Sequence, residues 1–222
     1  MITLRNVSVA FGPRTILRQA RARFERGQVH LVTGANGAGK STLLKVISGL
    51  VRPSGGRVVW EEEASVGYLG HATFLYPALT ARENLAFWQR AAGLPDDERT
   101  VMTMLERVGL ARHADTRAGV FSRGMQQRLN LARVLLAAPD ALLLDEPGTG
   151  LDAPSRDLLD SEITAARGRG ACVIWVSHDV ERDRRLADAV LAIRGRALVT
   201  LAGNDGPAEP DADAAAKEGP AC

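Results

Sequence analysis

The pattern of apolar and polar positions changes twice along the chain and divides it into three parts. Short apolar runs of strand length fill the first part and return in the last, at residues 141–144, 172–176 and 190–193. Runs of this kind are typical of strands buried on both faces of a parallel sheet. Between these parts, residues 80–138 carry apolar side chains at helical spacing, which predicts a helical segment.

The first part predicts strands around one helix. The alternation of the first predicted strand slips in phase near Asn6. A helix with one apolar face is expected over residues 41–50. Strands are expected at residues 2–11, 16–24, 29–32, 57–60 and 66–69. Because strands alternate with helices through short loops, we predict an α/β fold with a parallel sheet.

The helical segment is predicted to form a subdomain over about residues 78–138. A capping box at 80–83 opens its first helix, and Gly93 closes that helix. A second helix is expected over 99–108, and a third begins at Ser122. Since this segment lies between strands that should share one sheet, we interpret it as an insertion into a single domain.

The predicted domain covers residues 1–202, and residues 203–222 are expected to be a disordered acidic tail. The tail is rich in Ala, Gly, Pro, Asp and Glu and contains no large apolar residue. Such a composition buries too little apolar surface to offset the entropy lost on ordering. The closing hairpin of the domain is expected at 190–201, around an Arg-Gly-Arg turn.

Composition and charge restrict the possible partners. The 222 residues are 45% hydrophobic, which is enough for a sizeable core, and their formal net charge is +2. This balance gives no strong positive field, so we expect no nucleic-acid partner. No run approaches the ~20 apolar residues of a membrane-spanning helix. We therefore expect a protein that is soluble or bound to a membrane through a partner.

The motif with the clearest chemistry is the Gly-rich stretch after the strand at 29–32. Glycines let the backbone wrap a polyphosphate with its N–H groups inward, and the helix that follows adds partial positive charge. Lys40 should lie near the β- and γ-phosphates, and the Ser41 hydroxyl is the expected Mg²⁺ ligand. The stretch fits the pattern G-x-x-x-x-G-K-[ST] with Gly34, Ala35, Asn36, Gly37, Ala38, Gly39, Lys40, Ser41 and Thr42.

Two carboxylates follow the apolar strand at 141–144. Asp145 and Glu146 would stand at the carboxyl end of that strand, where open α/β sheets bind their ligands. Asp145 is expected to hold Mg²⁺ through water, and Glu146 to act as general base toward an attacking water. His178 follows the strand at 172–176 and could reach the γ-phosphate. Alone, an Asp-Glu pair is typical of a turn and a single His of a structural role; their order after a phosphate loop favours catalysis.

The start of the third predicted helix suggests a second anion site. Ser122 is a good N-cap residue, and that could be its whole role. A capped helix N-terminus with a small residue at Gly124 is also suited to bind an anion. One chain needs only one such site for one phosphate tail, whereas a head-to-tail pair of chains needs both.

The order and spacing of these motifs resemble the nucleotide-binding subunit of an ATP-binding cassette (ABC) transporter over residues 2–201. Residues 34–42 match the Walker A loop, 142–146 the Walker B motif with its catalytic Glu, and 121–125 the signature motif. The resemblance implies a P-loop NTPase fold that hydrolyses ATP with Mg²⁺. That fold has a mostly parallel sheet core, an N-terminal antiparallel β part and an all-helical subdomain.

Further roles and departures follow from the same resemblance. Phe11 stands where the family stacks an aromatic ring on adenine, Asp152 belongs to the D-loop, and His178 matches the switch histidine. Two family members sandwich two ATP molecules, each between one Walker A loop and the other's signature helix, which implies a second copy of this chain as partner. Arg123 and Met125 replace the usual Gly and Gln of the signature motif.

A narrower resemblance concerns His71, which stands where the family usually has Gln. Residues 68–71 and 79–90 are similar to the haem-exporter ATPase subunit of the cytochrome c maturation system. This implies integral membrane permease partners at the cytoplasmic face of the inner membrane, and export of haem or release of a haem carrier, without haem binding by this chain. A general drug or lipid exporter subunit and a soluble non-transport cassette ATPase remain alternatives. His71 would contact metal-bound water or the γ-phosphate, or only shape its loop.

Overall fold

A computed structural model describes residues 1–60, 63–70 and 72–203. His71 and the predicted tail beyond Gly203 lie outside the described residues. The described strands form a three-stranded antiparallel sheet and a six-stranded, mostly parallel sheet. The predicted fold class is therefore confirmed in its antiparallel N-terminal part, its parallel core and its separate group of helices.

The small sheet contains β1, β2 and β4, in the order β2-β1-β4. The phase slip expected near Asn6 is real: Asn6 has a φ of 52°, and the pairing of β1 with β2 shifts register between Leu4 and Val7. This irregularity is a bulge, which adds one residue and redirects the strand. The strands are β1 (Ile2–Phe11), β2 (Arg14–Phe24) and β4 (Gly55–Trp60).

The large sheet positions the chemistry. Its order is β5-β6-β7-β3-β8-β9, with every neighbouring pair parallel except β8 and β9. β3, β6 and β7 are buried throughout. They are neighbours and run parallel, so their carboxyl ends lie at the same edge of the sheet. The strands are β3 (Val29–Thr33), β5 (Val66–Leu69), β6 (Ala141–Asp145), β7 (Cys172–Val176), β8 (Ala189–Arg194) and β9 (Ala197–Ala202).

The helices follow the predicted pattern with one early end. α1 stops at Ile47 instead of residue 50, because Gly49 takes a φ of 79° and turns the chain out of the helix. The capping box at Thr80 is present, with Glu83 as its partner. The α-helices are α1 (Lys40–Ile47), α2 (Ala81–Ala91), α3 (Glu98–Arg107), α4 (Arg123–Leu135), α5 (Ala153–Gly168) and α6 (Val180–Asp183); 3₁₀ turns lie at Ala111–His113, Ala118–Val120 and Arg184–Leu186.

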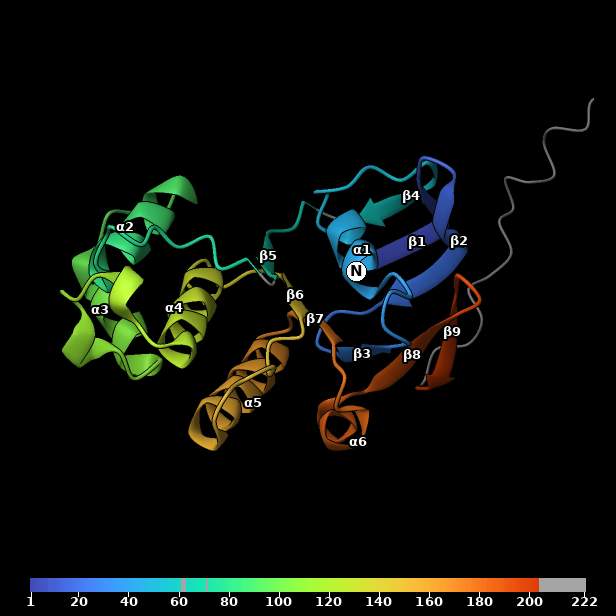
Figure 1. Cartoon of the computed structure of the whole chain (residues 1–222). Helices are drawn as coiled ribbons and strands as arrows, with labels where there is room; N and C mark the ends of the chain where they lie inside the picture. The colour runs from blue at the N-terminus through green and yellow to red at the C-terminus, as the bar shows by residue number, and fades with distance from the viewer. Residues whose placement is uncertain (61–62, 71, 204–222) are drawn as a thin grey trace, which may run out of the picture.

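Two hydrophobic clusters lie on opposite faces of the large sheet. Along β6, Leu142 and Leu144 belong to the cluster with the helical segment, whereas Leu143 belongs to the cluster with α1 and the small sheet. Alternate residues of a strand point to opposite faces, which explains the division. Figure 1 shows α2, α3 and α4 grouped at one end and the small sheet with α1 at the other. Among the described residues, no helix combines the length and apolar character needed to cross a membrane.

Candidate functional site

The Gly-rich loop joins β3 to α1 in a conformation that needs glycine. Gly34, Gly37 and Gly39 have φ values of 148°, 75° and 106°, and a Cβ on Gly39 would lie 2.7 Å from Cγ2 of Ile16. Gly39 is also the N-cap of α1, and no side chain caps that end. The first N–H groups of α1 are therefore available to an anion, as expected at a helix N-terminus that binds phosphate.

Lys40 closes the loop on itself. Its Nζ donates hydrogen bonds to the carbonyl oxygens of Gly34 at 2.8 Å and Ala35 at 3.1 Å, and the residue is buried. The ammonium group is thus held across the loop at the N-terminal end of α1, and its third N–H is not used by these bonds. A phosphate oxygen is a stronger acceptor than a backbone carbonyl because it carries charge.

Ser41 and Asp145 meet at the edge of the sheet. The Ser41 Oγ donates to Asp145 Oδ1 at 3.0 Å, and the Tyr68 hydroxyl lies 3.4 Å from Oδ2. Burial, and then the charge of Asp145, raises the pKa of Tyr68 to about 12, so the phenol stays a protonated donor.

The donor set around Asp145 fits Mg²⁺. Carboxylate and hydroxyl oxygens are ligands this hard ion prefers, and it commonly takes only one or two carboxylates and completes its shell with substrate phosphates and water. The described residues contain no group of three or more His, Cys, Asp or Glu side chains placed to hold a metal. Ser41 and Asp145 would hold the ion only together with a bound phosphate.

Glu146 and His178 form the second pair at this edge. The Glu146 Oε1 lies 2.5 Å from His178 Nε2. Glu146 has a φ of 54°, which is uncommon for a residue with a side chain. Its N–H donates to the Val176 carbonyl at 3.0 Å, and its carbonyl accepts from Thr149 N–H at 3.1 Å. These bonds hold the carboxylate just past the end of β6.

A cavity of about 400 Å³ joins these groups. It lies over the second half of the loop and reaches Glu146 and His178, with β2 on its other side. A basic loop with free N–H groups thus faces a carboxylate and an imidazole across one space, which can hold a polyphosphate and a water molecule. The lining residues are Arg14, Ile16, Asn36, Gly37, Gly39, Lys40, Ser41, Thr42, Glu146 and His178.

The structure does not bring the start of α4 into this cavity. Ser122 caps its own helix, accepting from Met125 N–H at 3.3 Å, and the space beside Gly124 is open. Neither residue lines the cavity. Arg123, the departure from the usual signature, packs on the D-loop, where a Cβ on Gly150 would lie 3.3 Å from its guanidinium carbon.

The remaining predicted residues lie at the margin of the site. Phe11 ends β1, is 54% exposed, and lines neither of the two cavities beside the loop. Asp152 caps α5 by accepting from Ser155 N–H at 3.0 Å, and hydrogen bonds from Ser155 lower the pKa of this carboxyl. His71 lies outside the described residues, so its contacts stay a prediction.

Sequence reasoning missed Arg14, Ile16 and Tyr68 as parts of the site. Tyr68 lies beside Asp145 because β5 pairs with β6, and the sequence alone does not give that strand order. Arg14 and Ile16 reach the loop only because the small sheet packs over it. No local pattern in the sequence reports that packing.

Comparison with known proteins identifies consistent relatives. A family model described as ABC transporter matches residues 17–149. The linearmycin resistance ATP-binding protein of Bacillus subtilis is 35% identical over 86% of this chain, which spans 65% of that protein. The cytochrome c biogenesis ATP-binding export protein of Haemophilus influenzae is 35% identical over 80% of this chain, which spans 88% of it.

Solved structures agree in fold. An ATP-binding subunit of an ABC transporter superposes with a TM-score of 0.83 at 25% identity, covering 90% of each chain. A dimeric ATP-binding cassette in a post-hydrolysis state, bound to ADP and Pi, superposes with a TM-score of 0.81 at 23% identity and covers 91% of this chain. The second likeness concerns the fold alone.

Proposed function

The chain belongs to the ABC transporter family as an ATPase of the cassette type, and from this we propose that it powers an exporter, with haem or a haem carrier as the cargo. One observation carries the catalytic part of the proposal. One cavity is lined by residues from distant parts of the chain, Lys40, Ser41, Glu146 and His178. Asp145 accepts a hydrogen bond from Ser41, and Glu146 contacts His178.

In the proposed reaction, the loop holds the phosphates of ATP through its N–H groups and Lys40. Ser41 and Asp145 would hold Mg²⁺, which would supply positive charge to the β- and γ-phosphates. Glu146 takes a proton from a water as the water oxygen attacks the γ-phosphorus, and the bond to ADP breaks. His178 orients Glu146 through their contact and lies at the γ-phosphate side of the cavity.

We propose that a second copy of the chain completes the site. Ser122 and Gly124 of one copy would face the γ-phosphate held by the other, where the capped N-terminus of α4 offers its N–H groups to the anion. Phe11 would stack on adenine, and Asp152 would stand at the contact between copies. The support is that Ser122 and Phe11 are exposed, and that neither is among the described residues lining the two cavities beside the loop.

The proposed membrane partner would bind beside the helical segment. Phe74, Tyr76 and Val120 are large apolar residues that are exposed, and the segments carrying them are joined, since Gly119 N–H donates to the Pro77 carbonyl at 2.9 Å. The Trp88 indole donates to the Phe74 carbonyl at 3.1 Å and fixes this surface to α2. An exposed apolar patch of this kind favours a protein partner, here a permease subunit at the cytoplasmic face of the inner membrane.

The cargo is the part of the proposal on which the relatives differ. The relative from Haemophilus influenzae supports cytochrome c biogenesis, while the equally identical relative from Bacillus subtilis supports resistance to an antibiotic. The haem assignment also depends on residues 68–71 and 79–90, which resemble haem-exporter subunits. This chain is proposed to bind ATP and its partners, and not haem.

A complementation experiment separates the two cargoes. A strain lacking this chain would be assayed for covalent haem in its c-type cytochromes and for growth in linearmycin, with the parent chain or Glu146→Gln restored. The proposal expects loss of covalent haem, rescue by the parent and no rescue by Glu146→Gln. Normal cytochromes together with antibiotic sensitivity would assign the chain to antibiotic export. Copurification of detergent-solubilised membrane subunits would identify the permease.

A further inference from the structure

Arg14 is a cation at the nucleotide cavity that none of the recognised motifs includes. It begins β2, directly after the turn at Gly12 and Pro13, and it pairs in register with Phe11 across the β1–β2 hairpin. Directly paired residues of an antiparallel hairpin project to the same face, with their Cβ atoms about 4.5–5.5 Å apart. The Arg14 side chain therefore leaves its strand beside Phe11, the residue proposed to stack on adenine.

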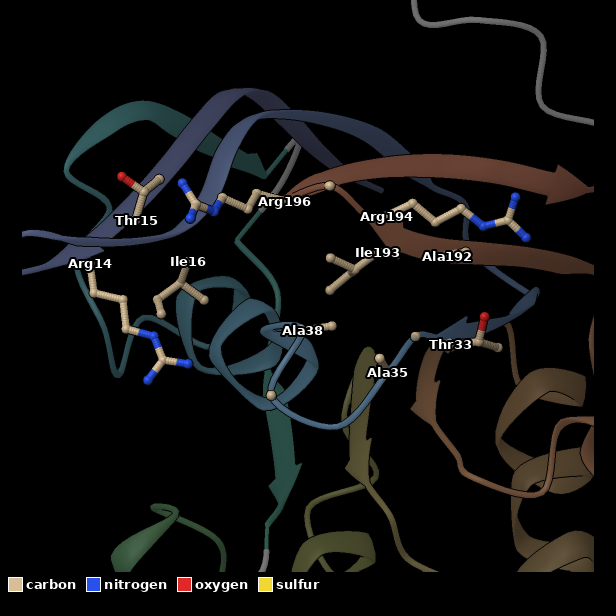
Figure 2. Close-up of a pocket in the computed structure, with 13 residues that line it drawn as sticks. Arg14, Thr15, Ile16, Thr33, Ala35, Ala38, Ala192, Ile193, Arg194 and Arg196 are labelled. Carbon is tan, nitrogen blue, oxygen red and sulfur yellow. The ribbon is translucent and has the colours of Figure 1, made fainter.

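The direction of the Arg14 side chain follows from strand alternation. Arg14 and Ile16 share one face of β2, and Thr15 takes the other. Ile16 packs on the phosphate loop, because its Cγ2 limits the space at Gly39. Figure 2 shows Arg14 and Ile16 extending to the same side of β2, toward the loop before α1, while Thr15 and Arg194 point elsewhere. Arg14 is thus aimed at the loop.

Two cavities meet at Arg14. The smaller one contains Lys40, Ser41, Glu146 and His178, and a larger one of about 600 Å³ lies between the loop and the β8–β9 turn. Arg14, Ile16 and Gly37 are the lining residues the two cavities share. A ligand whose phosphates lie along the loop would pass this shared rim where its triphosphate leads to the ribose.

The charge of Arg14 is uncompensated in the described part of the chain. Its guanidinium has no hydrogen bond or ion pair with any described residue, whereas other arginines, such as Arg26 and Arg107, are paired with carboxylates. Among the described residues that line the smaller cavity, Lys40 is the only other lysine or arginine, and it is held on two carbonyls. One ammonium does not balance a triphosphate, even with a divalent ion.

We propose that Arg14 is a nucleotide-binding residue that contacts the α- or β-phosphate of ATP from the β2 side of the loop, opposite Lys40. This rests on the proposed function, because it deepens the same site. The planar guanidinium presents paired N–H donors that match phosphate oxygens, and such charge-assisted bonds are stronger than neutral ones. Phe11 and Arg14 would then hold the base and the phosphates from adjacent positions of one hairpin.

The test measures binding of ATP and of inorganic tripolyphosphate by calorimetry, both with Mg²⁺, to the parent chain and to Arg14→Ala, Arg14→Lys and Arg194→Ala. We expect Arg14→Ala to raise the Kd for both ligands by about 10- to 100-fold, as for loss of a charged hydrogen bond. Arg14→Lys should raise the Kd less than Arg14→Ala does, because it keeps the charge but loses the paired N–H donors of the guanidinium. Arg194 also lines the larger cavity, but its side chain points away from the loop (Figure 2), so Arg194→Ala should change the Kd less than about twofold.

Other outcomes reject the proposal in distinguishable ways. A Kd that rises for ATP but not for tripolyphosphate would mean that Arg14 contacts the base or ribose. An unchanged Kd for both, or an equal loss in Arg194→Ala, would remove Arg14 from the site. If the parent chain binds neither ligand, the nucleotide site itself fails. Unfolding temperatures of all variants separate loss of binding from loss of the fold, and Arg14→Gln serves where Arg14→Ala is unstable.

Discussion

The carboxyl edge of the large sheet and the start of α4 are the two halves of the proposed catalytic site. They differ in how many of their functional groups already contact one another. At the sheet edge, Ser41 and Asp145 are 104 positions apart in sequence and share a hydrogen bond, and Glu146 contacts His178. At the start of α4, the Ser122 hydroxyl accepts a hydrogen bond from Met125 of its own helix, and the space beside Gly124 is open in the described part of the chain.

This difference shows which interactions a single chain can complete. Three buried parallel strands end side by side, so the groups that follow them are brought together by the same hydrogen bonds that build the sheet. The start of α4 lies outside the cavity at that edge, and the space beside Gly124 is open. We therefore propose that the sheet edge is a half-site formed within one chain and that the helix start acts together with a second copy.

The largest expected effect concerns the sheet edge. Glu146→Gln keeps the shape and removes the base, so turnover should fall by about 10²- to 10⁴-fold while the Kd for ATP stays near that of the parent. Steady-state hydrolysis and calorimetric binding measure the two quantities. Normal turnover in this variant would mean that another group activates the water and that Glu146 is not the general base.

A similar loss of turnover is expected from the helix start, with a different cause. Ser122→Asp keeps a good N-cap for α4 but places a carboxylate where a phosphate should bind. Turnover should fall by about 10²-fold or more, as for loss of an electrostatic stabiliser, while one chain still binds ATP at its own loop. If Ser122→Asp weakens ATP binding to the isolated chain, the two half-sites lie in one copy and the comparison fails.

The smallest expected effect is a control on the helical segment. Thr80→Ala removes the side-chain half of the capping box of α2 and should cost about 0.5–2 kcal/mol of unfolding free energy. For a chain of this size a change of 1 kcal/mol lowers the melting temperature by about 2–4 °C. Hydrolysis at 25 °C should stay near the parent rate. A large loss of activity would indicate that any damage to the helical segment, and not the chemistry at Ser122, explains the Ser122→Asp result.

The sequence predicted those parts of the molecule that depend on local pattern or on motifs. The strands, the capping box at Thr80 and the groups at the sheet edge follow from periodicity and spacing. The predicted helix end at Leu50 was wrong by three positions, because Gly49 ends the helix and α1 stops at Ile47.

What could not be predicted depends on how separate parts pack. The approach of Arg14 and Ile16 to the loop needs the position of the small sheet, and Tyr68 at Asp145 needs the order β5-β6. A single sequence contains no local signal for either. Residues that complete a site across a tertiary contact are therefore the ones sequence reasoning leaves out.

The central claim is that ATP joins two copies through the sheet edge of one and the helix start of the other. Sedimentation velocity of Glu146→Gln tests it, because ATP should persist in this variant. The 23.7 kDa chain should be a monomer without nucleotide and double in mass with ATP and Mg²⁺, and adding Ser122→Asp should restore the monomer. A chain that remains monomeric at saturating ATP, or a double variant that dimerises as well as Glu146→Gln, would contradict the claim.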